Sequence, residues 1–486
     1  MKGNSIPHRF FWSWDHSTNW SLHAYGAHNC GVANAYAKAP GMFEVDYRRA
    51  VDFCAEHKID AVGIVGLFRD KHGGIDSVRR LCSYAMEKGV RIYQIAGLYA
   101  YGGIYYEGDH PYSLNNFFEK NPDCIGETET GEKFFAQFKG IHGYNREPQG
   151  CPSNPLLNEF VLESLDWLFR DIPELGGIQI EAGDNGVCQC PRCRARRGKG
   201  TGYISVVDMA GIYPDAVNTI LRRSPDALVI CETYGHFSQP QNDIFRTDTP
   251  DENLQKLFDM PEKVFWQWKC DQVLAENTWN IGDPMIPNLQ KFNHVMRSHS
   301  GTHWKTGRGT FAVEKIRQQC LLRYESGLQG VSIFGEYAPF HTNAEFNYLA
   351  MEYFSDHPHA SPEDYIQDVM APRLGGKSLA EFYYESATLY DQPEKIPAAV
   401  TQMAKIVPTL TDYEHLRRWQ YLSSFLNGYY WEATQNHHLG DLNLLREEGP
   451  YKKQRPSVIR RASLFLYFSF QSDKNFPGET PTCCLN

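Results

Sequence analysis

The sequence lacks any apolar run long enough to span a bilayer, and it has no surplus of basic residues. Its first residues, MKGNSIPHRFFW, contain Pro and His where a secretory signal would have an apolar segment. The formal net charge of the 486 residues is -10, which argues against nucleic acid or an anionic membrane as a partner. We therefore expect a cytoplasmic protein with neither partner, while formation of a homo-oligomer stays open.

Nucleotide-binding fingerprints and a disulfide framework are absent as well. No Gly-rich dinucleotide or phosphate loop occurs, which argues against an open, doubly wound sheet. The 13 cysteines are an odd number, and most stand alone in apolar runs, as Cys54, Cys82 and Cys320 do. Such cysteines are typical of reduced thiols in the core of an intracellular protein.

Aromatic residues, in contrast, are abundant. They make up 14% of the chain, with 10 Trp and 28 Tyr. Aromatic rings stack on sugar rings and tyrosine hydroxyls bond to sugar hydroxyls, so this enrichment favours a carbohydrate ligand. Composition alone is explained more simply by an aromatic-rich core.

Strand-like and helix-like segments alternate over residues 1–358. The predicted strands are Phe10–Trp14, Ala61–Leu67, Arg91–Leu98, Gly177–Glu181, Ala227–Thr233, Val264–Trp268, His294–His299 and Gly330–Gly335. Segments with the apolar spacing of helices lie between them, among them Phe43–Lys58, Ile75–Lys88, Leu156–Arg170, Met209–Arg223 and Phe311–Ser326. This alternation predicts an α/β fold of the (β/α)8, or TIM-barrel, class over residues 1–358.

Two regions depart from the regular alternation. The loop after the third strand is long, from Tyr99 to about Pro155, which is typical of a binding loop or lid. Residues 359–486 have no strand pattern, and segments such as SLAEFYYESATLY and YEHLRRWQYLSSFLNGYYWEAT predict successive helices. We expect a C-terminal helical domain that packs on the barrel and ends in a loose tail, Gln471–Asn486.

Carboxylates follow the fourth and eighth predicted strands, Glu181 and Asp184 in GGIQIEAGD and Glu336 in SIFGEYAPF. Residues beyond the carboxyl ends of barrel strands meet at one mouth, where the fourth and eighth strands face each other. Glycoside hydrolysis needs such a pair, because one acid protonates the leaving oxygen and a second carboxylate acts as base or nucleophile. We predict a glycosidase of oligo- or polysaccharides in which Glu181 or Asp184 is the general acid and Glu336 the base or nucleophile. It needs no catalytic cofactor.

The other strand ends supply candidate sugar-binding residues. These are Trp14, Asp15, His16, Arg69, Asp70, Tyr101, Glu232, Tyr234, His236, Trp268, Lys269 and His299. Arg69 and Lys269 leave room for an acidic or sulfated sugar, since Arg binds anionic oxygens in a bidentate manner.

Structural roles compete with these functional ones. Glu181 could be paired with a basic residue, and Asp184 lies in AGDNG, where a turn or cap role is the alternative. Glu232 could form a buried salt bridge with Lys269. Trp14 and Trp268 could both be core residues.

A dense group of cysteines, Cys188, Cys190 and Cys193, follows the acids of the fourth strand. Structural zinc takes four thiolate or imidazole ligands, so the fourth would come from Cys151, Cys30, Cys231 or a histidine. A structural zinc site, a redox or disulfide role and a metal-free loop of thiols are the three interpretations. In each of them the cluster would make the acid-bearing loop rigid.

Two other functions remain as alternatives. A metal-dependent barrel hydrolase or lyase would use the histidines at positions 16, 236, 299, 303 and 341. The H-x-H pair that amidohydrolase barrels usually carry on the first strand is replaced here by Trp14-Asp15-His16. A carbohydrate-binding barrel without catalysis would not need so many acids at its mouth.

Three segments carry a family resemblance: FFWSWDHSTNW, IQIEAGD followed by CQCPRC, and SIFGEYAPFHTNAEFNYLAMEYF. They resemble TIM-barrel glycoside hydrolases of the retaining hexosaminidase and α-glucuronidase type, and bacterial proteins known as glycosyl-hydrolase-like. The helical region from Ser361 resembles the C-terminal part of such enzymes. Hexosaminidases that use the acetamido group of the substrate carry adjacent Asp and Glu after the fourth strand. Glu181 and Asp184 are separated and in the reverse order, so the resemblance implies the class of enzyme and not the sugar.

Overall fold

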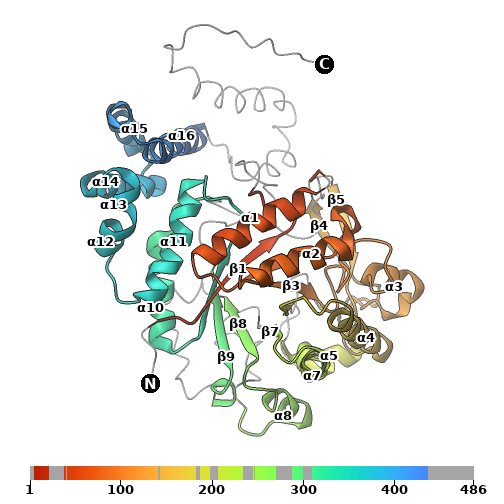
Figure 1. Cartoon of the computed structure of the whole chain (residues 1–486). Helices are drawn as coiled ribbons and strands as arrows, with labels where there is room; N and C mark the ends of the chain where they lie inside the picture. Colours follow the sequence, from red (N-terminus) through yellow and green to blue (C-terminus); the bar gives the residue numbers. More distant parts are fainter. Residues whose placement is uncertain are drawn as a thin grey trace, which may run out of the picture.

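Eight parallel strands close into a barrel in the computed structural model of the chain (Figure 1). The structure describes residues 5–20, 38–39, 41–140, 143–181, 187–197, 206–233, 245, 247–269, 287–298 and 309–435. In their order around the barrel, the strands are β1 (His8–Trp14), β2 (Ala61–Val65), β3 (Arg91–Gly97), β6 (Gly177–Glu181), β7 (Leu228–Glu232), β8 (Phe265–Lys269), β9 (Asn293–Arg297) and β10 (Gly330–Phe334). Each predicted strand overlaps one of them, and the predicted (β/α)8 fold class is confirmed.

Large and small side chains fit together inside the barrel. Trp12 is paired with Gly63, and Gly63 with Tyr93. A Cβ on Gly63 would lie 2.3 Å from the Tyr93 ring, so only glycine admits that ring. The inner cluster consists of alternate strand residues and part of the loop after β3: Phe10, Trp12, Trp14, Ala61, Val65, Tyr93, Ile95, Leu228, Ile230, Phe265, Val295 and Phe334, with Ala100, Tyr101 and Tyr106.

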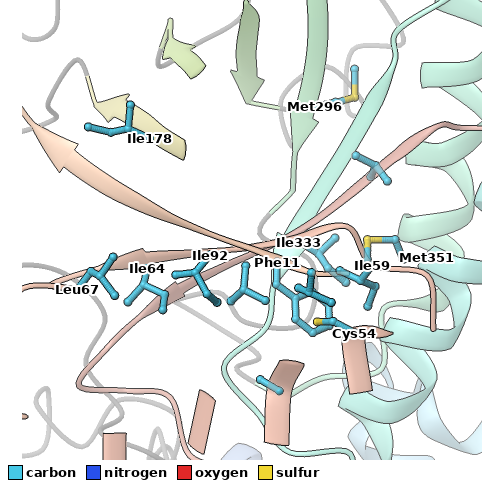
Figure 2. Packing of buried hydrophobic residues seen from close by; sticks show 14 of the residues in the cluster. Phe11, Cys54, Ile59, Ile64, Leu67, Ile92, Ile178, Met296, Ile333 and Met351 are labelled. Atoms are coloured by element: carbon cyan, nitrogen blue, oxygen red, sulfur yellow. The ribbon is translucent and has the colours of Figure 1, made fainter. Parts of the chain in front are cut away.

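Helices cover the outside of the barrel (Figure 1). They are α1 (Met42–Glu56), α2 (Gly74–Glu87), α4 (Pro155–Asp171), α7 (Tyr213–Arg223), α8 (Glu252–Phe258), α10 (Val313–Ser326) and α11 (Thr342–Asp356), with the shorter α3 (Leu114–Lys120), α5 (Pro191–Arg197) and α6 (Val206–Ala210) in connections. Because side chains alternate along a strand, every second strand residue faces these helices. Figure 2 shows several of them: Phe11, Ile64, Ile92, Ile178 and Ile333.

Beyond α11 the described chain is helical. The elements are α12 (Pro362–Tyr365), a π-helical turn (Ile366–Met370), α13 (Ala371–Leu374), α14 (Lys377–Ala387), α15 (Ile396–Ile406) and α16 (Tyr413–Gln435). They lie beside α11 on one side of the barrel (Figure 1), and the Tyr365 hydroxyl donates to the Phe346 carbonyl at 2.7 Å. Residue 359, the expected start of this region, falls between α11 and α12, while the expected tail lies outside the described residues. The main hydrophobic core runs from the barrel into these helices without a break.

The loop after β3 carries a hairpin of its own. Its strands β4 (Phe135–Gly140) and β5 (Gly143–Pro148) pair antiparallel. The Gly150 N–H donates to the Tyr99 carbonyl at 2.7 Å, and the Gln189 N–H donates to the Glu127 carbonyl at 2.6 Å. These bonds fix the loop both to the end of β3 and to the segment that follows β6.

Among the described helices, none combines the length and the hydrophobicity that a transmembrane span needs.

Candidate active site at the carboxyl end of the barrel

Two glutamates from neighbouring strands meet at the carboxyl end of the barrel. Glu181 ends β6 and Glu232 ends β7. Arg297, the last residue of β9, bridges them: its Nη2 lies 3.1 Å from Glu232 Oε1 and its Nη1 3.9 Å from Glu181 Oε1. The three side chains are at most 10% exposed. Because an isolated buried carboxylate is costly, the shared guanidinium allows the two acids to lie side by side.

Amide side chains extend this polar group. The Gln179 Nε2 donates to Glu181 Oε1 at 2.6 Å, and the Gln267 Nε2 donates to Glu232 Oε1 at 3.3 Å. The register of the strands points these residues inward. We call the set the polar arc, which spans β6 to β9 and consists of Gln179, Glu181, Glu232, Gln267 and Arg297. The opposite side of the barrel, from β10 through β1 and β2 to β3, forms an aromatic arc of Phe334, Trp12, Trp14, Val65 and Ile95.

A second charged cluster follows β1 and β2. Arg69 donates through Nε to the Asp15 carboxylate and through Nη1 to Glu107. Burial by itself would raise the pKa of Asp15, but the Arg69 guanidinium and the His16 side chain lower it to about 2. Gly66, at φ +79°, makes room for this carboxylate, because a Cβ there would lie 2.5 Å from Asp15 Oδ1. Asp15 is therefore ionised at neutral pH and its charge is already paired.

The hairpin brings one more acid to this cluster. Glu147, on β5, interacts electrostatically with Arg69 and Glu107. The Arg69 guanidinium also lies 4.2 Å from the centre of the Tyr106 ring. Burial raises the pKa of Glu147 to about 7, with Arg69 opposing the shift and Glu107 adding to it. The buried Glu147 Oε2 has no hydrogen-bond partner in the part of the chain that the structure describes. A carboxyl group with this pKa is partly protonated at pH 7, as a general acid has to be.

Trp12 and Trp14 lie between the two charged clusters. The Arg297 guanidinium lies 5.0 Å from the centre of the Trp12 ring. The Trp12 and Trp14 rings meet edge to face at 5.6 Å, and the Trp14 ring lies 5.5 Å from that of His16. Trp14, a predicted sugar-binding residue, therefore borders both clusters at the end of β1.

Glu336 lies near the same end of the barrel but is tied into the backbone. Its fully buried Oε1 accepts hydrogen bonds from the Trp14 N–H at 3.0 Å and the Ser17 hydroxyl at 2.5 Å. Its carbonyl accepts a third from the Asn19 N–H at 2.9 Å. These contacts hold the segment after β1, which carries Asp15.

Three other predicted residues are placed apart from these clusters or at their border. Asp70 is exposed and accepts hydrogen bonds from the Tyr105 hydroxyl and the Asp109 N–H. Tyr101 is buried in the inner cluster with a φ of 54°. Trp268 is fully buried on the outward face of β8, where its indole N–H donates to His294 Nδ1 at 3.0 Å. Trp268 is thus a core residue, the alternative considered for it.

Some predicted positions lie outside the described residues. These are Asp184, Tyr234, His236 and His299, together with the side chain of Lys269. Cys188, Cys190 and Cys193 are described: they are buried together and are joined by Cys151 from the loop after β3.

Sequence reasoning misses Arg297 and Glu147. Arg297 falls inside the predicted seventh strand, two positions after the inward Val295, so strand alternation could have placed it inside the barrel. Glu147 belongs to a hairpin within a long loop, where no strand-end rule applies, and no signal in the sequence points to it.

Known proteins that the chain resembles were compared by sequence and by structure. No protein-family model and no curated protein matches the sequence. A GH138 enzyme targeting pectin rhamnogalacturonan II superposes with a TM-score of 0.50 at 9% identity, over 88% of this chain and 57% of the enzyme. Eubacterium rectale Amy13B and an Anoxybacillus alpha-amylase each give 0.43, at 9% and 11% identity, over 73% and 74% of this chain and 80% of theirs.

The likeness to the GH138 enzyme concerns the fold alone and agrees with the closed eight-stranded barrel of this chain. The chain spans little more than half the length of the GH138 enzyme. At such low identity a shared barrel does not carry the activity with it, because this fold supports many chemistries.

Proposed function

We propose that this protein is a glycoside hydrolase that acts on an oligo- or polysaccharide by carboxylate catalysis. The observation that carries the proposal is the pair Glu181 and Glu232, side by side at the ends of adjacent strands and bridged by Arg297. TIM-barrel enzymes carry their chemistry at this end of the barrel. Glycoside hydrolysis requires a carboxyl group that donates a proton and a carboxylate that acts as base or nucleophile, and this pair would supply the second of these.

We assign the proton donor to Glu147 and the base or nucleophile to Glu181 or Glu232. Glu147 holds a proton near neutral pH because it is buried. Glu181 and Glu232 lie beside the Arg297 guanidinium at the ends of their strands, where a base or nucleophile would face the substrate. The sequence-based alternative makes Glu181 or Asp184 the acid and Glu336 the base. Glu336 fits that role less well, because its side chain already accepts two hydrogen bonds from the segment after β1.

The two arcs support a sugar as the substrate. A pyranose has carbon-bound hydrogens on its faces and hydroxyls on its edges, so it can contact indole rings on one side and amides and carboxylates on the other. An acidic or sulfated sugar has less support from Arg69, whose guanidinium is already paired with Asp15 and Glu107. Whether the substrate is a hexosaminide or a uronide, as the resemblance to hexosaminidases and α-glucuronidases implies, is tested by the substrate panel below.

The test is turnover of a panel of aryl glycosides, with neutral sugars, hexosaminides and uronides, by the full chain. On any substrate that is cleaved, Glu181→Gln and Glu232→Gln should each lower kcat at least about 100-fold, in the range for loss of a catalytic carboxylate. The matched control is Glu174→Gln, which removes a surface pair with Arg79 before β6 and should leave kcat unchanged. Product stereochemistry by NMR would then separate retention from inversion.

The same assay separates the competing assignments. If Glu336 only holds the backbone, Glu336→Gln lowers the unfolding midpoint but keeps most of the kcat of the folded protein. A loss of kcat in Glu336→Gln as large as in Glu181→Gln would instead support its assignment as the base. Near wild-type turnover in both Glu181→Gln and Glu232→Gln, or sugar binding without turnover across the panel, would overturn the proposal.

A further inference from the structure

Four cysteine sulfurs converge where two loops of the barrel meet. Cys188, Cys190 and Cys193 follow β6, and Cys151 comes from the loop after β3. The four Sγ atoms lie within 4.8 Å of one another, and all four residues are buried. None is in a disulfide. Among the described residues this is the only group of three or more His, Cys, Asp or Glu side chains that could hold a metal ion.

The spacing of the sulfurs fits a tetrahedral metal ion. Cys151 Sγ lies 3.8 Å from the Sγ atoms of both Cys190 and Cys193. Zinc binds thiolate at about 2.3 Å, so a regular tetrahedron of four sulfurs around it has edges of about 3.8 Å. Two thiols in van der Waals contact also lie at about this separation, so the convergence of all four sulfurs within 4.8 Å of one another carries the argument for a metal ion.

Hydrogen-bond donors lie against two of the four sulfurs. The backbone N–H groups of Glu127 and Cys190 point at Cys188 Sγ at 3.3 and 3.5 Å. The Ser153 hydroxyl lies 3.1 Å from Cys193 Sγ, and Arg196 Nη2 lies 3.5 Å from it. Donors of this kind disperse the negative charge of a metal-bound sulfur and orient it.

Two nearby arginines offset part of the charge of such a site. Zinc with four thiolates carries a net charge of -2, and the thiols release their protons to solvent on binding. Arg196 contacts Cys193 directly, and Arg197 donates through Nη2 to the Cys188 carbonyl. Both guanidinium groups are held in place by Asp208.

We propose that Cys151, Cys188, Cys190 and Cys193 bind one structural zinc ion. The ion would join the loop that carries Glu147 to the segment that follows Glu181, and so fix the two candidate acid-bearing regions relative to each other. All four ligand positions are taken by protein, as in structural rather than catalytic zinc sites. The site does not depend on the proposed glycosidase activity.

The test is metal analysis of the purified full chain by mass spectrometry, expected to give about one zinc per chain. X-ray absorption at the zinc edge should then show four sulfur neighbours at about 2.3 Å. Replacement of zinc by cobalt should produce the thiolate charge-transfer and visible bands of tetrahedral cobalt. These readings use the wild-type protein, so they decide the question even where a variant fails to fold.

Variants add a matched comparison. Cys151→Ser and Cys190→Ser should lower the zinc content several-fold and lower the unfolding midpoint. Cys124→Ser is the control, because Cys124 is a buried cysteine of the same loop that lies outside the cluster; it should keep its zinc. Iron in place of zinc, negligible zinc in the wild-type chain, disulfides among the four cysteines, or full zinc retention by Cys151→Ser would each overturn the proposal.

Discussion

At the scale of single residues, two arginines organise the charges at the carboxyl end of the barrel. Arg69 forms ion pairs with Asp15 and Glu107, and Arg297 forms ion pairs with Glu181 and Glu232. Each guanidinium offers several donors in a rigid fork, so one side chain can contact two acids from different elements. Glu147 differs from these acids, because burial outweighs the attraction of Arg69 and keeps its proton on near neutral pH.

The pKa of Glu147 leads to a prediction about pH. A general acid works while it is protonated, so kcat/KM should fall as the pH rises through about 7, the value to which burial raises the pKa of Glu147. Glu147→Gln should lower kcat/KM about 100-fold or more at pH 6 and should lose this alkaline decline. The measurement is a pH–rate profile from pH 5 to 9 for both proteins. An unchanged decline in Glu147→Gln would show that another group supplies the proton.

The candidate acids differ in how far sequence can predict them. Glu181 and Glu232 could be predicted from the sequence as residues of the site, because each ends a short apolar strand and strand ends converge in a barrel. Trp268 follows the same rule but faces outward, since it is one position out of phase with the inward Gln267. Contacts across the barrel, such as those of Arg297, depend on which strands are neighbours and on side-chain rotamers. Neither can be read from the chain.

At the scale of elements, the end of β2 shows how backbone shape sets a charged contact. The strand is followed by Gly66 at φ +79°, and the space that its missing side chain leaves is taken by the Asp15 carboxylate. β1 and β2 can therefore approach closely at their carboxyl ends. The strands and the α/β alternation were predictable from apolar periodicity, but this approach was not, because it joins residues from two strands.

Gly66→Ala tests this contact against a matched glycine. Alanine at a left-handed φ costs about 1 to 2 kcal/mol by itself, and at Gly66 the new Cβ would also press on the Asp15 carboxylate. Gly41, before α1, has a φ of +80°, and a Cβ there would have no atom within 4 Å, so Gly41→Ala carries the backbone cost alone. In urea unfolding we expect Gly66→Ala to lose at least about 1 kcal/mol more, the usual cost of overpacking. Equal losses in the two variants would refute the contact.

At the scale of the whole molecule, the barrel and the C-terminal helices behave as parts of one core. The contact between them includes a buried ion pair: Glu345 on α11 accepts hydrogen bonds from Arg418 on α16 at 2.6 to 3.2 Å, and Arg417 Nη2 lies 3.3 Å from it. Within the C-terminal helices, the fully buried Trp419 on α16 donates to the Leu374 carbonyl at the end of α13. Because the core is continuous, we expect one cooperative unfolding transition for both parts.

Glu345→Gln tests this coupling. Removing one partner of a buried pair leaves charge uncompensated, so the variant should lose about 3 to 5 kcal/mol. Calorimetry should show the single transition moved to lower temperature. Glu314→Gln, which removes a partly exposed pair with Arg317 on α10, should cost less than about 1 kcal/mol. A split into two transitions in the wild-type protein, or an equal shift in the two variants, would contradict the coupling.

The division of the barrel interior into a polar arc and an aromatic arc also affects which ligands would fit the proposed site. A ligand that is polar all round, such as phosphate or a small dicarboxylate, would face indole and aliphatic carbon along the aromatic arc. A wholly apolar ligand would leave the amides and acids of the polar arc without partners. Only a molecule that is itself two-faced can satisfy both sides at once. If the proposed function holds, discrimination at this end of the barrel would depend on how the apolar and polar faces of a ligand are oriented, in addition to its charge and size.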